Sequence, residues 1–245
     1  MKKFGRIFKD ASFFLTKIEN NNMILIIIII IKGGIFMICK KTECKLYLEC
    51  LHDYNQYYRI NIIKKLGPLL LKDKPIHLFC FKNDFKFKQE IVDLIEEHFS
   101  GLQNIQYVFI PCDNDTVKIL FYNINNIGKV LKDHRKVNFL ESRGFSREMG
   151  GLDYIQYLVK ELQKNNIPPE IGIFFGYPVK DVIGYIGHPS LKRTEVKGWE
   201  YYGNPKVSNE VYETFTEAEQ TVLKYLLIKQ FQLEQFLQKL DLKIA

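Results

Sequence analysis

The 245-residue sequence lacks the residue patterns that identify most enzymes and metal-binding proteins. It contains no GxxxxGK[ST] phosphate-binding loop, no GxSxG nucleophile turn and no HExxH zinc-binding pair. Its five histidines are scattered, and the spacings of its five cysteines match neither zinc nor iron–sulfur sites. An odd number of cysteines, in a chain long enough to fold without disulfides, favours reduced thiols in a cytoplasm. Short motifs therefore assign no catalytic residue, metal site or cofactor.

Basic residues outnumber acidic ones, with a formal net charge of +7, but they are unevenly spread. Residues 1–36 hold six of the lysines and arginines and only two of the acidic residues. The rest of the chain is therefore only weakly basic, and its lysines are scattered. Because nucleic-acid-binding domains usually concentrate basic residues on one face, the sequence gives no strong signal for a nucleic-acid partner.

The longest hydrophobic run lies near the beginning of the chain. Nine consecutive apolar residues precede Lys32-Gly33-Gly34, whereas a transmembrane helix needs roughly 20. Two interpretations stay open. Residues 23–39 could anchor the protein to a membrane, or translation could begin at Met37, because Lys32-Gly33-Gly34 can be encoded by a ribosome-binding sequence. We expect residues 1–36 to be a wrongly assigned start or a hydrophobic extension, and residues 37–245 to form a single cytoplasmic domain.

Hydrophobic periodicity predicts an alternation of helices and strands in the rest of the chain. Helical spacing predicts helices over residues 42–65, 83–99, 126–131, 137–140 and 152–162, from 178, and after 202 to the C-terminus. Apolar or β-branched runs predict strands over residues 75–81, 105–110, 117–122, 171–175 and 199–202. The short connection after residue 110 makes the second and third strands antiparallel neighbours. These elements predict an α/β (α+β) fold with a mixed sheet of about five strands, a split βαβ-like core, flanking helices and a long C-terminal helix.

Residues 168–186, PPEIGIFFGYPVKDVIGYI, resemble the sequence HEIGLFLGYPxEDVIGFI of an uncharacterised bacterial family, a domain of unknown function. Residues 67–75 and 197–203 resemble two further segments of that family, CAPTLAGxKP and GyWKVYG, more loosely. The family's histidine before Glu170 is Pro169 in this chain, and a His-Cys pair before the first segment is missing. The resemblance implies an accessory role linked to iron and flavodoxin, and it carries over no metal-binding or catalytic role for the missing side chains.

The turn at Gly176 is the first candidate binding site. Free N–H groups at the start of the helix that follows can hold an anion, but the glycine also permits a tight turn, and Asp181 can cap the helix. Tyr177, Trp199 and Tyr201 accompany cationic residues, a combination that can stack a flat base or cofactor or form a cross-strand aromatic cluster. The tentative ligand site comprises Gly176, Tyr177, Asp181, Arg193, Trp199 and Tyr201.

Two functional hypotheses follow from these residues. A ligand- or partner-binding accessory protein would use the surface around Gly176 and Trp199. An enzyme of unknown reaction would need groups from separate segments to converge there, namely Glu170, Asp181, His188 and Arg193. The lack of a catalytic motif favours the binding protein, in which Glu170 lies at a solvated strand end.

Leucines recur at heptad spacing near the C-terminus: Leu223, Leu226, Leu233, Leu237 and Leu240. This stripe is shorter than an independent coiled coil requires. Two arrangements stay open: the stripe docks on its own domain, or it forms a homodimer through the C-terminal helix.

Overall fold

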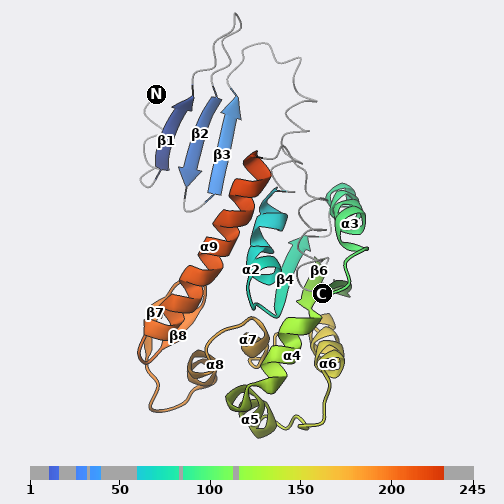
Figure 1. The fold of residues 1–245 in the computed structure, drawn as a ribbon, viewed down its shortest axis with the longest axis vertical. Coiled ribbons are helices and arrows are strands. Elements are labelled where there is room, and N and C mark those ends of the chain that lie inside the picture. Colours follow the sequence, from blue (N-terminus) through green and yellow to red (C-terminus); the bar gives the residue numbers. More distant parts are fainter. Residues whose placement is uncertain are drawn as a thin grey trace, which may run out of the picture. The chain divides into compact units, whose positions relative to one another are not determined.

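The computed structural model describes residues 11–16, 26–31, 34–39, 60–82, 85–112 and 116–228 (Figure 1). Contacts divide the chain into two units, Met1–Tyr54 and Asn55–Ala245. The described residues of the first unit form an antiparallel sheet in the order β1-β2-β3, with strands at Ala11–Thr16, Ile26–Ile31 and Gly34–Cys39. The isoleucine run is therefore the central strand, as the β-propensity of isoleucine favours. The domain boundary after residue 36 stays a prediction.

A second antiparallel sheet of three strands forms the centre of the larger unit. Its strands are β4 (Ile76–Lys82), β5 (Ile105–Cys112) and β6 (Thr116–Asn123), in the order β4-β6-β5. The predicted antiparallel pairing of the second and third strands is confirmed. Side chains of β6 alternate between the two faces, with Ile119 and Phe121 packed on one side and Leu120 on the other.

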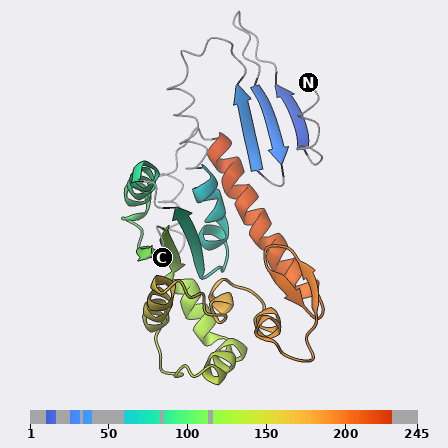
Figure 2. The same ribbon diagram turned by 180° about the vertical axis from the view of Figure 1, so that it is seen from behind.

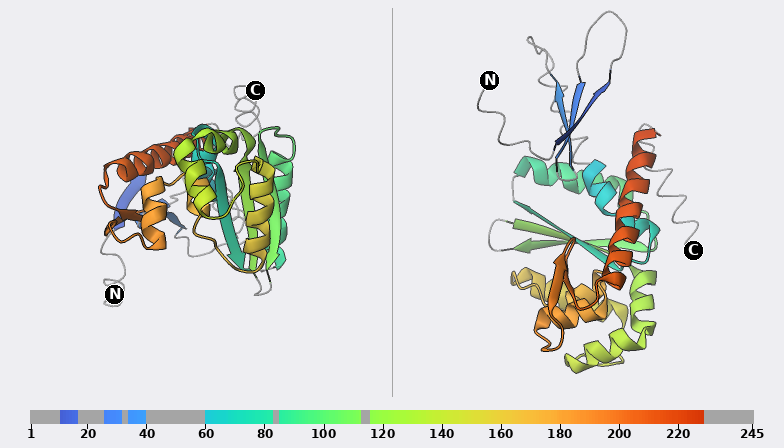
Figure 3. Two further views of the ribbon diagram at one scale, coloured as in Figure 1. Left: turned by 90° about the horizontal axis from the view of Figure 1, so that it is seen from below. Right: turned by 90° about the vertical axis from the view of Figure 1, so that its left-hand side faces the viewer.

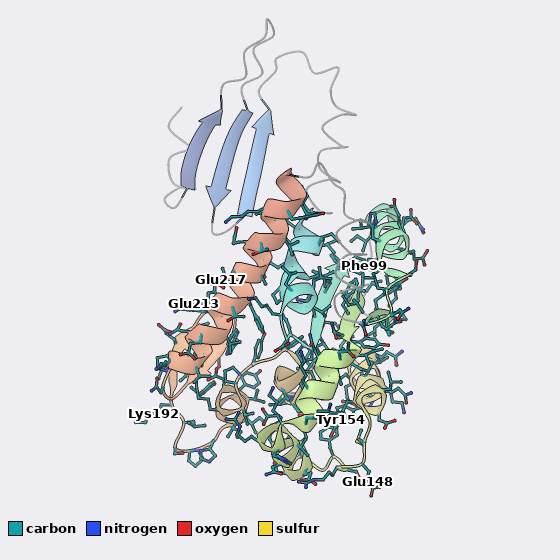
Figure 4. The ribbon with its side chains drawn as sticks, in the orientation of Figure 1. Phe99, Glu148, Tyr154, Lys192, Glu213 and Glu217 are labelled. Carbon is teal, nitrogen blue, oxygen red and sulfur yellow. The ribbon has the colours of Figure 1, made fainter. Side chains whose placement is uncertain are left out.

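Helices cover both faces of this sheet, as the right-hand view of Figure 3 shows. One core lies between the sheet and a layer made of helical residues 60–65, α2 (Gly67–Leu71), α3 (Phe85–Phe99) and α9 (Lys206–Ile228). The other core lies between the sheet and α4 (Ile124–Lys132), α5 (His134–Ser142), α6 (Gly151–Gln163), α7 (Ile171–Phe174) and α8 (Val179–Ile186). Phe99 and Tyr154 mark these two cores in Figure 4. Each fully buried large apolar side chain stabilises the fold by about 1.5–3 kcal/mol.

The fold is α+β with a long C-terminal helix, as predicted, but its sheet is smaller than predicted and entirely antiparallel. Two further strands, β7 (Arg193–Val196) and β8 (Glu200–Tyr202), form a separate hairpin. This hairpin lies beside the first turns of α9 (Figure 2), where Lys197 donates a hydrogen bond to Asn209. Of the helix predicted over residues 42–65, residues 60–65 are helical and residues 42–59 lie outside the described part of the chain.

The strand predicted over residues 171–175 is wrong, because Ile171–Phe174 form the short buried helix α7 and Phe175 is its C-cap. A short apolar run without periodicity fits a buried helix as well as a buried strand. The helix ends in a Schellman motif, in which the Gly176 N–H donates to Ile173 and the Tyr177 N–H donates to Gly172. Gly176 has a φ of 80°, the left-handed conformation that this motif requires and that glycine adopts without strain.

The C-terminal helix α9 runs for 23 residues and packs against α2. The helices approach closely at Gly67, where an added Cβ atom would lie 2.8 Å from the Ala218 carbonyl oxygen. Leu223 and Leu226 are buried within this unit, so the first two leucines of the predicted stripe dock on their own domain. The other three, Leu233, Leu237 and Leu240, lie outside the described residues. No described helix is both long and apolar enough to span a bilayer.

Candidate functional site

Aromatic side chains from three separate segments form one contiguous group, which we call the aromatic cluster: Phe175, Tyr177, Trp199, Tyr212 and Phe215. The Tyr177 and Trp199 rings are stacked, with their centroids 4.4 Å apart and their planes inclined by 16°. The Trp199 centroid lies 6.3 Å from that of Tyr212 and 6.4 Å from that of Phe215, both on α9. All members of the cluster are only half-buried, so each presents part of its side chain to solvent.

A buried lysine lies against this cluster. Lys74 directly precedes the Pro75–β4 segment and is only 9% exposed. Its Nζ atom lies 5.2 Å from the centroid of Phe215 and 5.9 Å from that of Phe175, within the range of cation–π attraction. Within the described residues no carboxylate lies at ion-pair distance from Lys74, because Glu219 pairs instead with Lys65 at 2.9 Å.

The surroundings of Lys74 disfavour its charged form. Burial lowers the pKa of Lys74 from 10.5 to about 8, and the negative charge of Glu219 only partly opposes this shift. Within the part of the chain that the structure describes, the hydrogen-bonding neighbour of the Nζ atom is Nδ1 of His77, at 3.2 Å. Burial, and then the positive charge of Lys74, hold the pKa of His77 well below its ordinary value. Since a lysine ammonium can only donate, Nδ1 of the neutral His77 is the acceptor.

The turn at Gly176 brings the predicted site against Lys74. A Cβ atom added to Gly176 would lie 3.0 Å from Cζ of Phe215 and 3.6 Å from Cδ of Pro75. The turn therefore requires a glycine at position 176 for two reasons: its left-handed φ and the close approach of these two side chains. The same turn places Tyr177 on Trp199, so the segment after α7 connects the buried amine with the half-buried rings of the aromatic cluster.

Asp181 organises the hydrogen bonds behind the aromatic cluster. This carboxylate is only 2% exposed and accepts hydrogen bonds from Trp199 Nε1 at 2.9 Å, Ser208 Oγ at 2.7 Å and the Tyr202 N–H at 2.8 Å. Lys180 Nζ also donates to it at 2.6 Å. Asp181 therefore connects α8 to the hairpin and to α9 and orients the Trp199 ring, whereas the sequence favoured a role in capping α8.

Two other predicted site residues have different surroundings. Tyr201 is fully buried beside Trp199, with ring centroids 5.1 Å apart, and burial is the main cause that raises its pKa to about 12. Arg193 lies on the exposed strand β7 and pairs with Glu200 at 2.7 Å. The structure thus brings together Gly176, Tyr177, Asp181, Trp199 and Tyr201. Arg193 belongs to the same hairpin as Tyr201, but its guanidinium group pairs with Glu200.

The groups considered for an enzyme each have partners of their own. Glu170 is not at a solvated strand end: it is 5% exposed at the start of α7, where Tyr157 donates to it at 2.8 Å. The predicted strand end was wrong because the segment is helical and turns inward. Nδ1 of His188 lies 2.9 Å from the Ser190 hydroxyl. In the described part of the chain, no hydrogen bond or ion pair joins any two of Glu170, Asp181, His188 and Arg193.

Sequence reasoning missed Lys74, His77, Phe175, Tyr212 and Phe215. Lys74 and Pro75 end a segment that carries the family resemblance, and a lysine directly before a buried strand was the available signal. Tyr212 and Phe215 are three residues apart on a helix and therefore share a face, but nothing in the sequence says which segment that face meets. Among the described residues, no group of three metal-ligating side chains could hold a metal ion.

The three segments that carry the resemblance, residues 67–75, 168–186 and 197–203, meet at this site. Fold and site together define an α+β protein in which a buried lysine lies against a half-exposed aromatic surface. Residues 62–237 match the model of a family described as "Protein of unknown function (DUF3793)", and the chain belongs to this family. No curated protein and no solved structure matches the chain.

Proposed function

We propose that this protein is a cytoplasmic accessory protein that binds a flat, negatively charged ligand at the aromatic cluster. The observation that carries the proposal is the Lys74 amine, which is buried against half-buried rings and has no carboxylate of the described residues in contact. Cys80 and Cys112 are free thiols, which supports a reducing compartment.

The buried charge of Lys74 destabilises the fold. A change in the Lys74 pKa from 10.5 to about 8 corresponds to about 3 kcal/mol of destabilisation whenever the amine is protonated and buried. An apolar residue at this position would avoid that cost. An anionic ligand group placed beside Nζ would also remove it, and in doing so would gain affinity from the missing counter-charge.

The rings supply the second part of the proposed binding surface. Stacking of a flat ligand on an aromatic side chain is worth about 1–3 kcal/mol. Asp181 holds the Trp199 ring by its Nε1 atom, and Tyr177 stacks on that ring, so the surface is ordered before a ligand arrives. Such preorganisation reduces the entropy that binding loses.

The alternative, an enzyme built from Glu170, Asp181, His188 and Arg193, has less support because these groups are engaged separately. The accessory role linked to iron and flavodoxin, which the family resemblance implies, is compatible with the proposal. Flavin mononucleotide is flat and carries a phosphate, so it has the shape and charge that the site favours.

Trp199 is the single tryptophan of the chain, and its fluorescence therefore reports directly on the proposed site. We expect flavin mononucleotide to quench this fluorescence saturably, neutral riboflavin to bind at least about tenfold more weakly, and inorganic phosphate to have little effect. The variant Lys74→Met should lose the preference for the phosphorylated flavin. Lys192→Met, which changes an exposed lysine (Figure 4), should retain it. Absence of saturable quenching, or an unchanged preference in Lys74→Met, would overturn the proposal.

A further inference from the structure

We infer that Lys74 is a carbonyl-reactive amine that forms an imine with an aldehyde or ketone carried by a flat anionic ligand. The seating of that ligand rests on the proposed function. The formation of the imine rests on the neighbours of the Lys74 nitrogen, and it has a test of its own.

The geometry around Lys74 differs from that around Lys118 and Lys180. Lys118 Nζ donates to the Leu162 carbonyl oxygen at 2.7 Å and to the Asn165 side chain at 2.8 Å. Lys180 Nζ donates to the Asp181 carboxylate and to the Tyr202 carbonyl oxygen at 2.8 Å. Oxygen acceptors of this kind stabilise an ammonium ion and occupy its N–H groups. Among the described residues, the Lys74 amine has instead a neutral imidazole nitrogen and two ring faces as its neighbours.

This environment leaves a larger share of Lys74 in the nucleophilic form. With a pKa of about 8, its neutral fraction near pH 7.5 exceeds that of an ordinary lysine by on the order of 100-fold. A lysine activated by removal from water, close to a hydrophobic surface, is the usual kind of amine that forms Schiff bases in proteins. The half-buried rings of Phe175 and Phe215 provide that surface.

The proposed step needs no oxidant or reductant. The neutral Nζ attacks the carbonyl carbon, the carbonyl oxygen takes up a proton, and the resulting carbinolamine loses water to leave a C=N bond to Lys74. The two protons that the nitrogen gives up pass to the carbonyl oxygen, one during addition and one as the hydroxyl group leaves as water. His77 Nδ1, at 3.2 Å from Nζ, stays neutral and accepts an N–H of the amine, which orients the nitrogen lone pair. One carbonyl compound and one amine give one imine and one water.

The probe that tests this inference is para-formylbenzoate, a flat anion with an aldehyde, with benzoate as the matched anion that cannot form an imine. The unaltered protein is incubated with the aldehyde and sodium cyanoborohydride, which reduces an imine to a stable adduct, and modified lysines are located by peptide mass spectrometry. We expect Lys74 to be labelled at least about tenfold faster than Lys118 and the exposed lysines. The labelling rate should rise with pH around pH 8, and prior benzoate should slow it.

Two readouts separate this inference from the proposed function. Quenching of Trp199 by benzoate and by the aldehyde reports the seating of a flat anion, and the reduced adduct reports the reactivity of Lys74. Quenching without an adduct on Lys74 overturns the inference and leaves the binding proposal standing. An adduct on Lys74 without any quenching supports the reactive amine and contradicts the binding surface. Labelling confined to exposed lysines overturns the inference without the need for a variant that must fold.

Discussion

Lys74 and Lys118 are almost equally buried, with exposures of 9% and 6%, yet their amines have different neighbours. Lys118 extends from the sheet to the end of α6, where it donates to two oxygen acceptors. One of these is the Leu162 carbonyl oxygen in the last turn of α6, which also accepts from the Asn165 N–H at 3.1 Å. Lys74 has a neutral imidazole and aromatic rings around it.

The difference shows that burial alone does not assign a role to a lysine. The contacts of Lys118 explain its position, because its charged amine donates to two oxygen acceptors of the fold. The contacts of Lys74 do not explain why a lysine occupies this position, because an ammonium ion there adds little to the stability of the fold. A buried group that lowers stability and makes no stabilising contact in exchange is a candidate for a functional role.

The largest effect is expected from removal of the structural amine. Lys118→Met should destabilise the protein by about 2–4 kcal/mol, because the Leu162 carbonyl oxygen and the Asn165 side chain lose a charged donor in a buried site. Urea unfolding followed by circular dichroism measures this change. Trp199 quenching by ligand should be unaffected under conditions in which the variant is folded, and a variant as stable as the parent would contradict the structural role.

The opposite sign is expected for the other lysine. Lys74→Met should stabilise the protein at pH 7 by about 1–3 kcal/mol, because methionine keeps the apolar stem and removes the buried charge, while the cation–π contacts that it loses offset part of the gain. The same urea experiment measures this change. A loss of stability similar to that of Lys118→Met would end the distinction between the two lysines.

The pH dependence of stability sharpens the same comparison. The pKa of Lys74 is lower in the folded protein, about 8, than its ordinary value of 10.5. Between these two pH values the unfolded chain binds more protons, so the free energy of unfolding should rise with pH relative to Lys74→Met, by up to about 3 kcal/mol. Below pH 8 both states are protonated, and the difference between the two proteins should stay constant.

Two tyrosines also change the free energy of unfolding at the upper end of this pH range. The pKa values of Tyr157 and Tyr201 are raised to about 12, mainly by burial, so these groups stabilise the fold below pH 10 and lose that contribution as the pH rises to 12. Because both tyrosines are present in the parent and in Lys74→Met, subtraction of the two pH profiles isolates Lys74. A flat difference profile between pH 8 and pH 10 would show that Lys74 is an ordinary lysine.

The smallest effect on the folded unit is expected at the end of the leucine stripe. We propose that Leu233, Leu237 and Leu240 mediate a homodimer, since Leu223 and Leu226 are already buried within their own unit. Changing Leu233 and Leu240 to lysine should convert a dimer into a folded monomer, with thermal unfolding of the monomer almost unchanged. Analytical sedimentation of the unaltered protein at tens of micromolar decides the question, and a monomer there would end the proposal.

Much of the secondary structure was predictable, because local patterns dominate it. The strands around residues 105–110 and 117–122 and the helix around residues 152–162 appear where alternation and helical spacing place them. Residues 171–175 were predicted wrongly, because an apolar run of this length carries no periodicity that separates a buried strand from a buried helix.

The candidate site was predictable only in part. Gly176, Tyr177 and Trp199 were found because a glycine turn and aromatic side chains are visible in the sequence. Asp181 was found with a different role, because its acceptor contacts with Ser208 and Trp199 come from segments 27 and 18 residues away. The sequence alone does not distinguish the buried carboxylate of Asp181, which is 2% exposed, from an exposed carboxylate in the first turn of a helix.

The sequence by itself determined the order of most helices and strands, the left-handed turn that only glycine accepts at position 176, and the placement of one tryptophan among tyrosines. These properties depend on a residue and its near neighbours in the chain. The tertiary structure alone decided the chemistry of Lys74, by packing Phe175, Phe215 and His77 around its amine and leaving Glu219 paired elsewhere. Desolvation and charge depend on which atoms surround a group in space, and both rings beside the Lys74 amine, Phe175 and Phe215, come from residues more than a hundred positions away.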